Sequence, residues 1–126
     1  MANPIVWGEI YVQDMARARK FYETVLNVRL QNLEVPAGMM PGMEMAAFPA
    51  KMEAPGATGA LVRMPGVPSG GSTILYFGCE DCAVEAGRVE KAGGKIHKSK
   101  FSIGKHGFIA LAVDTEGNMF GLYSMK

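Results

Sequence analysis

The chain has 126 residues, 48% of them hydrophobic, and its 13 basic residues nearly balance its 12 acidic ones. This length fits one domain, or two half-domains that share a core. The charges are interspersed and form no basic block, which argues against nucleic acid or an anionic membrane as a partner. No apolar run approaches the roughly 20 residues of a membrane helix. The N-terminus also lacks the charged and apolar regions of a signal peptide, so we expect a cytoplasmic protein.

The N-terminal stretch predicts a strand, a capped helix and a second strand. Residues Ile5 to Val12 are rich in β-branched and aromatic side chains, which is typical of a strand. Asp14 stands where a helix N-cap belongs, and apolar residues recur at helical spacing from there to Leu26. Asn27 suits a left-handed C-cap, and the pattern of residues 28–33 predicts the second strand.

Two more predicted strands complete the first half of the chain. The short apolar segment Met43 to Phe48 forms one of them, and Gly59 to Met64 forms the other. Pro and Gly residues interrupt the pattern between these strands and again over residues 65–71, which predicts loops and then a linker.

The same order of elements returns after the linker. Sliding the first copy by 67 positions (81 − 14) places Asp14 on Asp81 without a gap. A helix is predicted over residues 82–92, and Gly93 and Gly94 end it. The predicted strands of this second copy are 73–79, 95–100, 107–113 and 119–124.

This repeat dictates the architecture that we expect. It predicts an α+β fold made of two βαβββ modules, residues 1–66 and residues 72–126, which together form a single domain over residues 1–126. The repeat has few identities, so the prediction depends on the ordered pattern of strand, cap, helix, stop and strand.

The first strand carries the acid of greatest interest. Side chains alternate along a strand, so Trp7, Glu9 and Tyr11 share one face, and the other face is suited to packing against the helix. A carboxylate between two aromatic rings is partly desolvated and so available as a base. The alternative interpretation is a structural ion pair between Glu9 and Arg63 or another cation within the sheet.

Several other side chains have a functional and a structural interpretation. His106 lies beside glycines at the start of a predicted strand. Its functional interpretation is contact with a ligand or acid–base catalysis, and its structural interpretation is a plain loop residue. Cys79 and Cys82 form a C-x-x-C motif, typical of redox chemistry, although the two intervening carboxylates oppose thiolate formation. A group of methionines either fills gaps or forms an adaptable pocket wall. Its members are Met39, Met40, Met43, Met45 and Met52.

The whole chain resembles the vicinal oxygen chelate superfamily, which contains glyoxalases, bleomycin-resistance proteins and ring-cleaving dioxygenases. The motifs that carry the resemblance are VWGEIYVQDMARARKFYETVL, GALVRMPG, the GGK after the second helix, and GFIALAVDTEGNMFGLYS. The resemblance implies two four-stranded sheets that curve together with their helices outside, leaving a cleft for a small molecule. It also implies a homodimer.

In metal-dependent members of that superfamily, four strands each supply a His, Glu or Gln ligand. The matching positions here are Trp7, Ala60, Ile74 and Gly121, and none of these side chains binds a metal ion. The resemblance therefore implies a protein with no metal and no other cofactor, in which the missing side chain of Gly121 leaves an open space.

We therefore expect a site on the cleft face, with Glu9 and His106 as catalytic residues. The residues expected to contact a ligand are Trp7, Met45, Arg63, Tyr76, Phe108, Gly121 and Tyr123. The expected function is that of a glyoxalase-like protein that binds a small aromatic or planar organic ligand without metal. One alternative is a metal-dependent lyase or dioxygenase of the glyoxalase I type. The other is a non-catalytic protein that sequesters an antibiotic or a similar ligand, as bleomycin-resistance proteins do.

Overall fold

The computed structural model describes residues 3–35, 41–51, 53–68 and 73–126. Within these ranges the chain forms eight strands and two α-helices in the order of two βαβββ modules, so the predicted α+β fold is confirmed. The chain folds as two compact units, one of residues 7–73 and one of residues 1–6 together with 74–126. The predicted linker lies partly outside the described residues, and the predicted module boundary at residue 72 lies wholly outside them.

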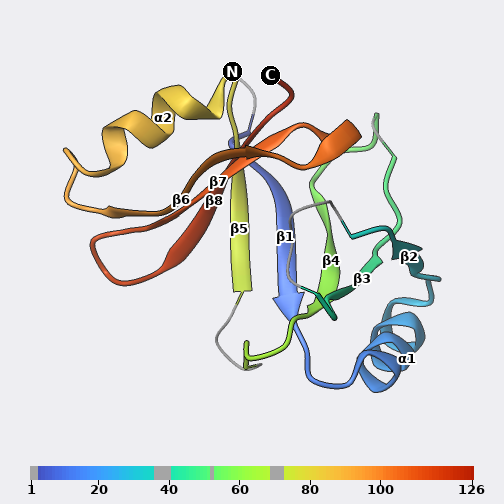
Figure 1. The fold of residues 1–126 in the computed structure, drawn as a ribbon. Helices are drawn as coiled ribbons and strands as arrows, with labels where there is room; N and C mark the ends of the chain where they lie inside the picture. Colours follow the sequence, from blue (N-terminus) through green and yellow to red (C-terminus); the bar gives the residue numbers. More distant parts are fainter. Residues whose placement is uncertain (1–2, 36–40, 52, 69–72) are drawn as a thin grey trace. The chain divides into compact units, whose positions relative to one another are not determined.

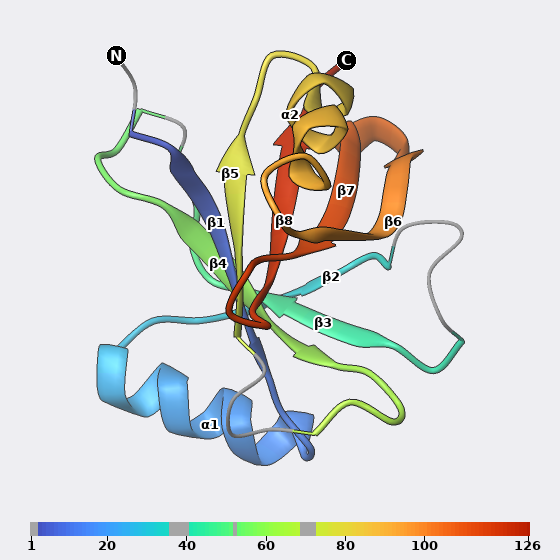
Figure 2. The same cartoon turned by 90° about the vertical axis from the view of Figure 1, so that its left-hand side faces the viewer.

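The first module orders its strands β2-β3-β4-β1, as Figures 1 and 2 show. Strands β1 and β4 are parallel, and the other two neighbouring pairs are antiparallel. The elements are β1 (Ile5–Tyr11), α1 (Met15–Leu26), β2 (Gln31–Leu33), β3 (Glu44–Ala47) and β4 (Thr58–Arg63).

Both predicted caps of α1 are present. The side chain of Asp14 accepts a hydrogen bond from the backbone N–H of Arg17 at 3.0 Å. Asn27 has φ 53° and ψ 51°, the left-handed conformation that ends the helix. On the inner side of α1, Met15, Ala18 and Tyr22 pack against the core of the first module, which includes the buried residues Val12, Leu30, Ala46 and Leu61.

The second strand of this module is shorter than predicted. It begins at Gln31, whereas the sequence pattern predicts a strand from Val28. Side chains of α1 bind the backbone of Leu30 instead: Glu23 accepts from its N–H at 2.8 Å, and Arg19 donates to its carbonyl oxygen. Side chains of α1 therefore satisfy the backbone N–H and carbonyl oxygen of Leu30, which would otherwise bond to a neighbouring strand.

The second module orders its strands β5-β8-β7-β6, with β5 parallel to β8 and the other pairs antiparallel. Its helix lies against one face of these strands (Figure 2). The elements are β5 (Thr73–Gly78), α2 (Cys82–Val89), β6 (Lys95–Ser102), the 3₁₀ turn η1 (Gly104–His106), β7 (Phe108–Val113) and β8 (Met119–Ser124).

The N-terminus of α2 is tied to two other segments. Asp81 caps the helix by accepting from the N–H of Ala83 at 3.0 Å, and the ammonium of Lys100 on β6 donates to the same oxygen at 2.8 Å. The N–H of Cys82 donates to the hydroxyl of Ser124 on β8 at 3.0 Å. The core beneath the helix contains Cys82, Ala110 and Leu122, with Phe77, Phe108 and Phe120 packed against them.

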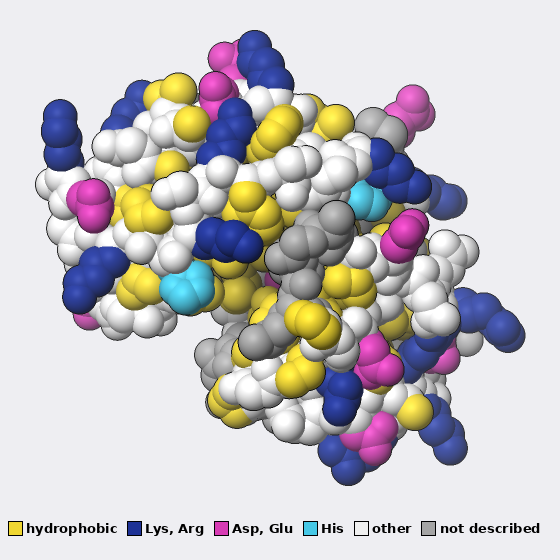
Figure 3. Space-filling view, in the orientation of Figure 1, with side chains coloured by type: hydrophobic (Ala, Val, Ile, Leu, Met, Phe, Trp, Pro, Cys, Tyr) yellow, Lys and Arg dark blue, Asp and Glu magenta, His cyan; other side chains and the backbone are white. Residues whose placement is uncertain are grey.

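The surface mixes charges of both signs. Figure 3 shows Lys and Arg side chains interspersed with Asp and Glu on the visible face, in agreement with the balanced sequence. Among the described residues, no helix is long and apolar enough to cross a membrane.

Candidate functional site

Glu9 lies in the middle of β1, on the face opposite α1. The indole N–H of Trp7 donates to its Oε2 at 3.1 Å, and the hydroxyl of Tyr11 donates to its Oε1 at 3.0 Å. Ile10 and Val12 pack in the helix-side core, so the predicted alternation along the strand is confirmed. Glu9 is only 6% exposed, whereas Trp7 is half-buried. A carboxylate is thus held in place by two neutral donors on its own strand.

Strands β4 and β3 place apolar side chains on the same face as Glu9. Ala60 is its register partner on β4 and Val62 is that of Tyr11, and neither residue is exposed to solvent. Met45 on β3 pairs with Val62 and is also buried. Burial is the largest cause that raises the pKa of Tyr11, followed by the charge of Glu9 and the hydrogen bond to it.

Met45 therefore lies on the same face of the sheet as Glu9. Met43 is buried, like Met45. Met39, Met40 and Met52 lie outside the described residues.

Arg63 does not lie with Glu9. Its register partner on β3 is Glu44, and its guanidinium lies 3.7 Å from that carboxylate. Its Nε also donates to the backbone oxygen of Gln13 at 3.3 Å. Arg63 is two residues from Leu61, which packs in the helix-side core, so both side chains point away from the face of Glu9. The alternative of an ion pair between Glu9 and Arg63 is wrong, as is the placement of Arg63 on the expected ligand face.

In the second module, Tyr76 and Gly121 are register partners on β5 and β8. A Cβ atom at Gly121 would lie 2.2 Å from Cδ2 of Tyr76, so the tyrosine ring covers this glycine directly. The open space expected at Gly121 is therefore filled by an aromatic ring. Tyr76 is 6% exposed, and it lies on the face opposite the α2 core, because the next residue, Phe77, belongs to that core.

Tyr123 lies two residues beyond Gly121 on β8, and its hydroxyl contacts His106 and Met125. Its hydroxyl donates to the backbone oxygen of His106 at 2.6 Å. The sulfur of Met125 lies 2.8 Å from the same hydroxyl oxygen. His106 itself is exposed on η1. The bond between the two residues is made by the backbone carbonyl of His106.

Phe108 is placed differently from the prediction. It packs against the core beneath α2, and the ammonium of Lys100 lies 4.7 Å from the centre of its ring. Ile109 and Tyr123 are register partners and so share one face of the sheet. Because side chains alternate along β7, Phe108 lies on the opposite face. The prediction that Phe108 joins Tyr123 on a ligand face is therefore wrong.

The C-x-x-C motif has the environment of structural cysteines. Cys82 is fully buried in the α2 core. Burial, with a further contribution from Glu85, raises the pKa of Cys79 to about 11. A raised thiol pKa disfavours the thiolate that redox chemistry needs. The structure therefore supports a structural role for the buried Cys82 and disfavours redox chemistry at the half-buried Cys79.

The side chains present do not fit a divalent metal ion. In the first module the two candidate ligand positions hold Trp7 and Ala60, and in the second they hold Ile74 and Gly121. Within the part of the chain that the structure describes, no three His, Cys, Asp or Glu side chains form a group that could hold a metal. The donors that metal sites require are therefore not gathered at these positions.

Sequence reasoning missed the role of one residue in this site. Tyr11 was placed on the correct face but not among the site residues, although it binds Glu9 directly. The period-two alternation of β1 is the signal that could have identified it, because residues two apart on a strand are neighbours on one face.

The model of the glyoxalase/bleomycin resistance protein/dioxygenase superfamily matches residues 4–122. The chain therefore belongs to this superfamily, as its repeat and motifs suggested. No curated protein matches it.

Solved structures of several proteins share the fold at low identity. A hypothetical protein from Bacillus halodurans C-125 is 12% identical, with a TM-score of 0.73 over 100% of this chain and 96% of that one. Methylmalonyl-CoA epimerase from Mycobacterium tuberculosis is 14% identical, with a TM-score of 0.68 over 98% of this chain and 88% of its own. The epimerase from Streptomyces coelicolor, in complex with 2-nitronate-propionyl-CoA, is 15% identical, with a TM-score of 0.67 over 98% of both chains. At these identities the likeness concerns the fold alone.

Proposed function

We propose that this protein binds a small aromatic or planar organic molecule beside Trp7, with Glu9 accepting a hydrogen bond or a proton from it. One observation carries the proposal: a buried carboxylate is held between the indole of Trp7 and the hydroxyl of Tyr11. The half-buried indole offers a planar surface for stacking, and the small and branched side chains around the carboxylate exclude water from it.

The geometry suits Glu9 to act as a fixed acceptor. A carboxylate whose two oxygens are both bonded does not rotate freely, so its orientation is set before a ligand arrives. In low-dielectric surroundings a hydrogen bond from a ligand to such a carboxylate is stronger than in water. The same arrangement suits transfer of a proton from an acidic C–H or O–H group. The similar structures named as epimerases are consistent with proton transfer on this scaffold.

The proposed activity uses no metal. The reason is the identity of Trp7, Ala60, Ile74 and Gly121, which supply no ligating side chain. Elemental analysis should therefore find no tightly held nickel, zinc, iron or manganese. One such ion per chain, lost when Glu9 is replaced, would contradict this part of the proposal.

The proposed assembly is a homodimer. Large apolar side chains remain exposed on α1: Phe21 is 58% exposed, Val25 62% and Leu26 53%. Strands β2 and β6 are also terminal in their modules, and open strand edges favour pairing.

The experiment uses the single tryptophan of the chain as its probe. Native mass spectrometry of freshly purified protein first identifies any molecule that copurifies. Catechol, a planar compound with hydroxyl donors, is then titrated while the fluorescence of Trp7 is recorded. We expect saturable quenching, and Glu9→Gln should weaken binding about tenfold because the amide is a poorer acceptor.

Glu44→Gln is the matched control, because Glu44 is also a strand acid but pairs with Arg63. It should leave the catechol titration unchanged. Circular dichroism checks that both variants fold. Equal weakening by both replacements, or no weakening by Glu9→Gln, would count against Glu9 as the acceptor.

A further inference from the structure

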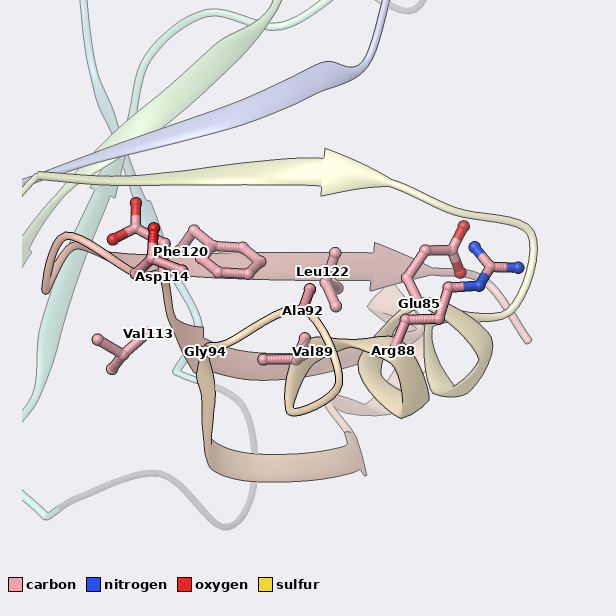
Figure 4. A pocket seen from close by; sticks show the side chains of 10 residues that line it. Glu85, Arg88, Val89, Ala92, Gly94, Val113, Asp114, Phe120 and Leu122 are labelled. Atoms are coloured by element: carbon pink, nitrogen blue, oxygen red, sulfur yellow. The ribbon is translucent and has the colours of Figure 1, made fainter.

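A cavity lies in the second module, and Glu9 does not line it. It is bounded by α2 and by the turn that joins β7 to β8, and its volume is about 300 Å³. Figure 4 shows Glu85 and Arg88 at one end and Asp114 at the other, with the ring of Phe120 and the side chain of Leu122 between them. The apolar wall consists of Val89, Ala92, Val113, Phe120 and Leu122.

The carboxylate of Glu85 interacts with the thiol of Cys79, but no ion pair neutralises either charge at this end of the cavity among the described residues. Glu85 and Arg88 are one turn apart on α2, and neither takes part in an ion pair with any residue that the structure describes. The Oε1 atom of Glu85 is buried and has no hydrogen-bond partner among the described residues. An unsatisfied buried carboxylate oxygen costs free energy, and a cation bound to this carboxylate would offset part of that cost.

The acid at the other end of the cavity is already occupied. Oδ1 of Asp114 accepts from the N–H groups of Glu116 and Asn118 at 2.8 and 2.9 Å, and Oδ2 accepts from the side-chain amide of Asn118 at 3.1 Å. Asp114 therefore shapes the turn, and Glu85 and Arg88 are the charges that remain for a ligand.

We infer that this cavity binds an α-amino acid with an apolar side chain. The ammonium group would pair with Glu85, the carboxylate would pair with Arg88, and the side chain would lie against Phe120 and Leu122. A purely cationic ligand would be repelled by Arg88, and a purely anionic one by Glu85. The volume is at the lower end of the range of about 300–1,000 Å³ for ligand pockets, which suits a molecule of this size.

The test is isothermal titration of the full chain with L-phenylalanine. Two analogues serve as comparisons: phenethylamine lacks the carboxylate, and 3-phenylpropionate lacks the ammonium group. We expect saturable binding of L-phenylalanine, and binding of each analogue weaker by about tenfold or more, since each loses one charge-assisted contact.

Variants locate the binding. Glu85→Gln and Arg88→Gln should each weaken binding of L-phenylalanine by about tenfold or more, and Ala92→Phe should block the cavity without changing its charges. Glu90→Gln and Lys91→Gln alter exposed charges next to the same helix that do not line the cavity, and they should have no effect. Thermal unfolding of each variant without ligand shows that it is folded.

Three results would overturn the inference. They are the absence of saturable heat at millimolar L-phenylalanine, equal binding of either analogue, and unchanged binding by both Glu85→Gln and Arg88→Gln. The outcome is independent of the function proposed for Glu9, because Glu9→Gln should leave binding of L-phenylalanine unchanged.

Discussion

The ring of Tyr76 on β5 covers Gly121, its register partner on the parallel strand β8. The absence of a side chain at Gly121 is therefore used for close packing: a glycine on one strand makes room for an aromatic ring from the next. The resemblance to the superfamily predicts an open space at Gly121, where metal-dependent relatives have a metal-binding side chain. In this structure the ring of Tyr76 fills that space.

Gly121→Ala should destabilise the second module by about 2 kcal/mol, as overpacking of a buried position commonly does. The reason is the distance of 2.2 Å between the new Cβ and Cδ2 of Tyr76, which the ring can relieve only by moving. Urea unfolding followed by circular dichroism measures the change. Tyr76→Ala removes the ring that the new Cβ at position 121 would meet, so it should cancel the effect of Gly121→Ala. The double variant should then be more stable than the sum of the two single changes predicts. Strict additivity would contradict this packing.

Tyr11 should resist ionisation in the folded protein. Burial first, and then the charge and hydrogen bond of Glu9, raise the pKa of its hydroxyl above the ordinary value near 10. The free energy of unfolding should therefore be unaffected by Tyr11 below about pH 10 and should fall as the pH rises beyond it, because the unfolded chain ionises more readily. Tyr11→Phe should lose this dependence. Chemical unfolding across alkaline pH tests it, and identical slopes for the two proteins would refute it.

Asp81 should make stability depend on pH in the acid range. The ammonium of Lys100, and then the N–H of Ala83, hold the pKa of Asp81 below its ordinary value of 3.8. The stabilisation from Asp81 should thus be fully present above about pH 4 and lost as the pH falls through the lowered pKa of the folded state. Asp81→Asn keeps a capping side chain but should flatten this part of the stability profile. Glu90→Gln replaces an exposed acid that forms no ion pair within the described part of the chain, so this variant should keep the wild-type slope.

The oligomeric state is tested by light scattering at micromolar concentration. One chain has a mass of 13.5 kDa, so a homodimer should give 27 kDa (2 × 13.5). If the exposed apolar side chains of α1 contribute to the interface, Val25→Lys should shift the mass toward that of one chain, because it places a charge on this face. A wild-type mass of 13.5 kDa would contradict the proposed dimer.

Local chemistry made much of the fold predictable from the sequence. Asp14, Asn27 and Asp81 are capping residues whose side chains or backbone preferences act within a few positions, and all three cap as predicted. The alternation of Trp7, Glu9 and Tyr11 is likewise a property of one strand, and the expected face of β1 was correct.

Contacts between distant segments decided the rest. Whether Arg63 meets Glu9 or Glu44 depends on strand register and on which face each residue occupies, and the structure pairs it with Glu44. Phe108 lies in the α2 core because β7 presents that face to the helix. The sequence by itself determined the repeat, the caps and the alternation, because these depend on neighbours along the chain. Only the tertiary structure decided that Tyr76 fills the space above Gly121 and that Glu85 and Arg88 border a cavity, because packing between elements depends on side-chain volume and direction in three dimensions.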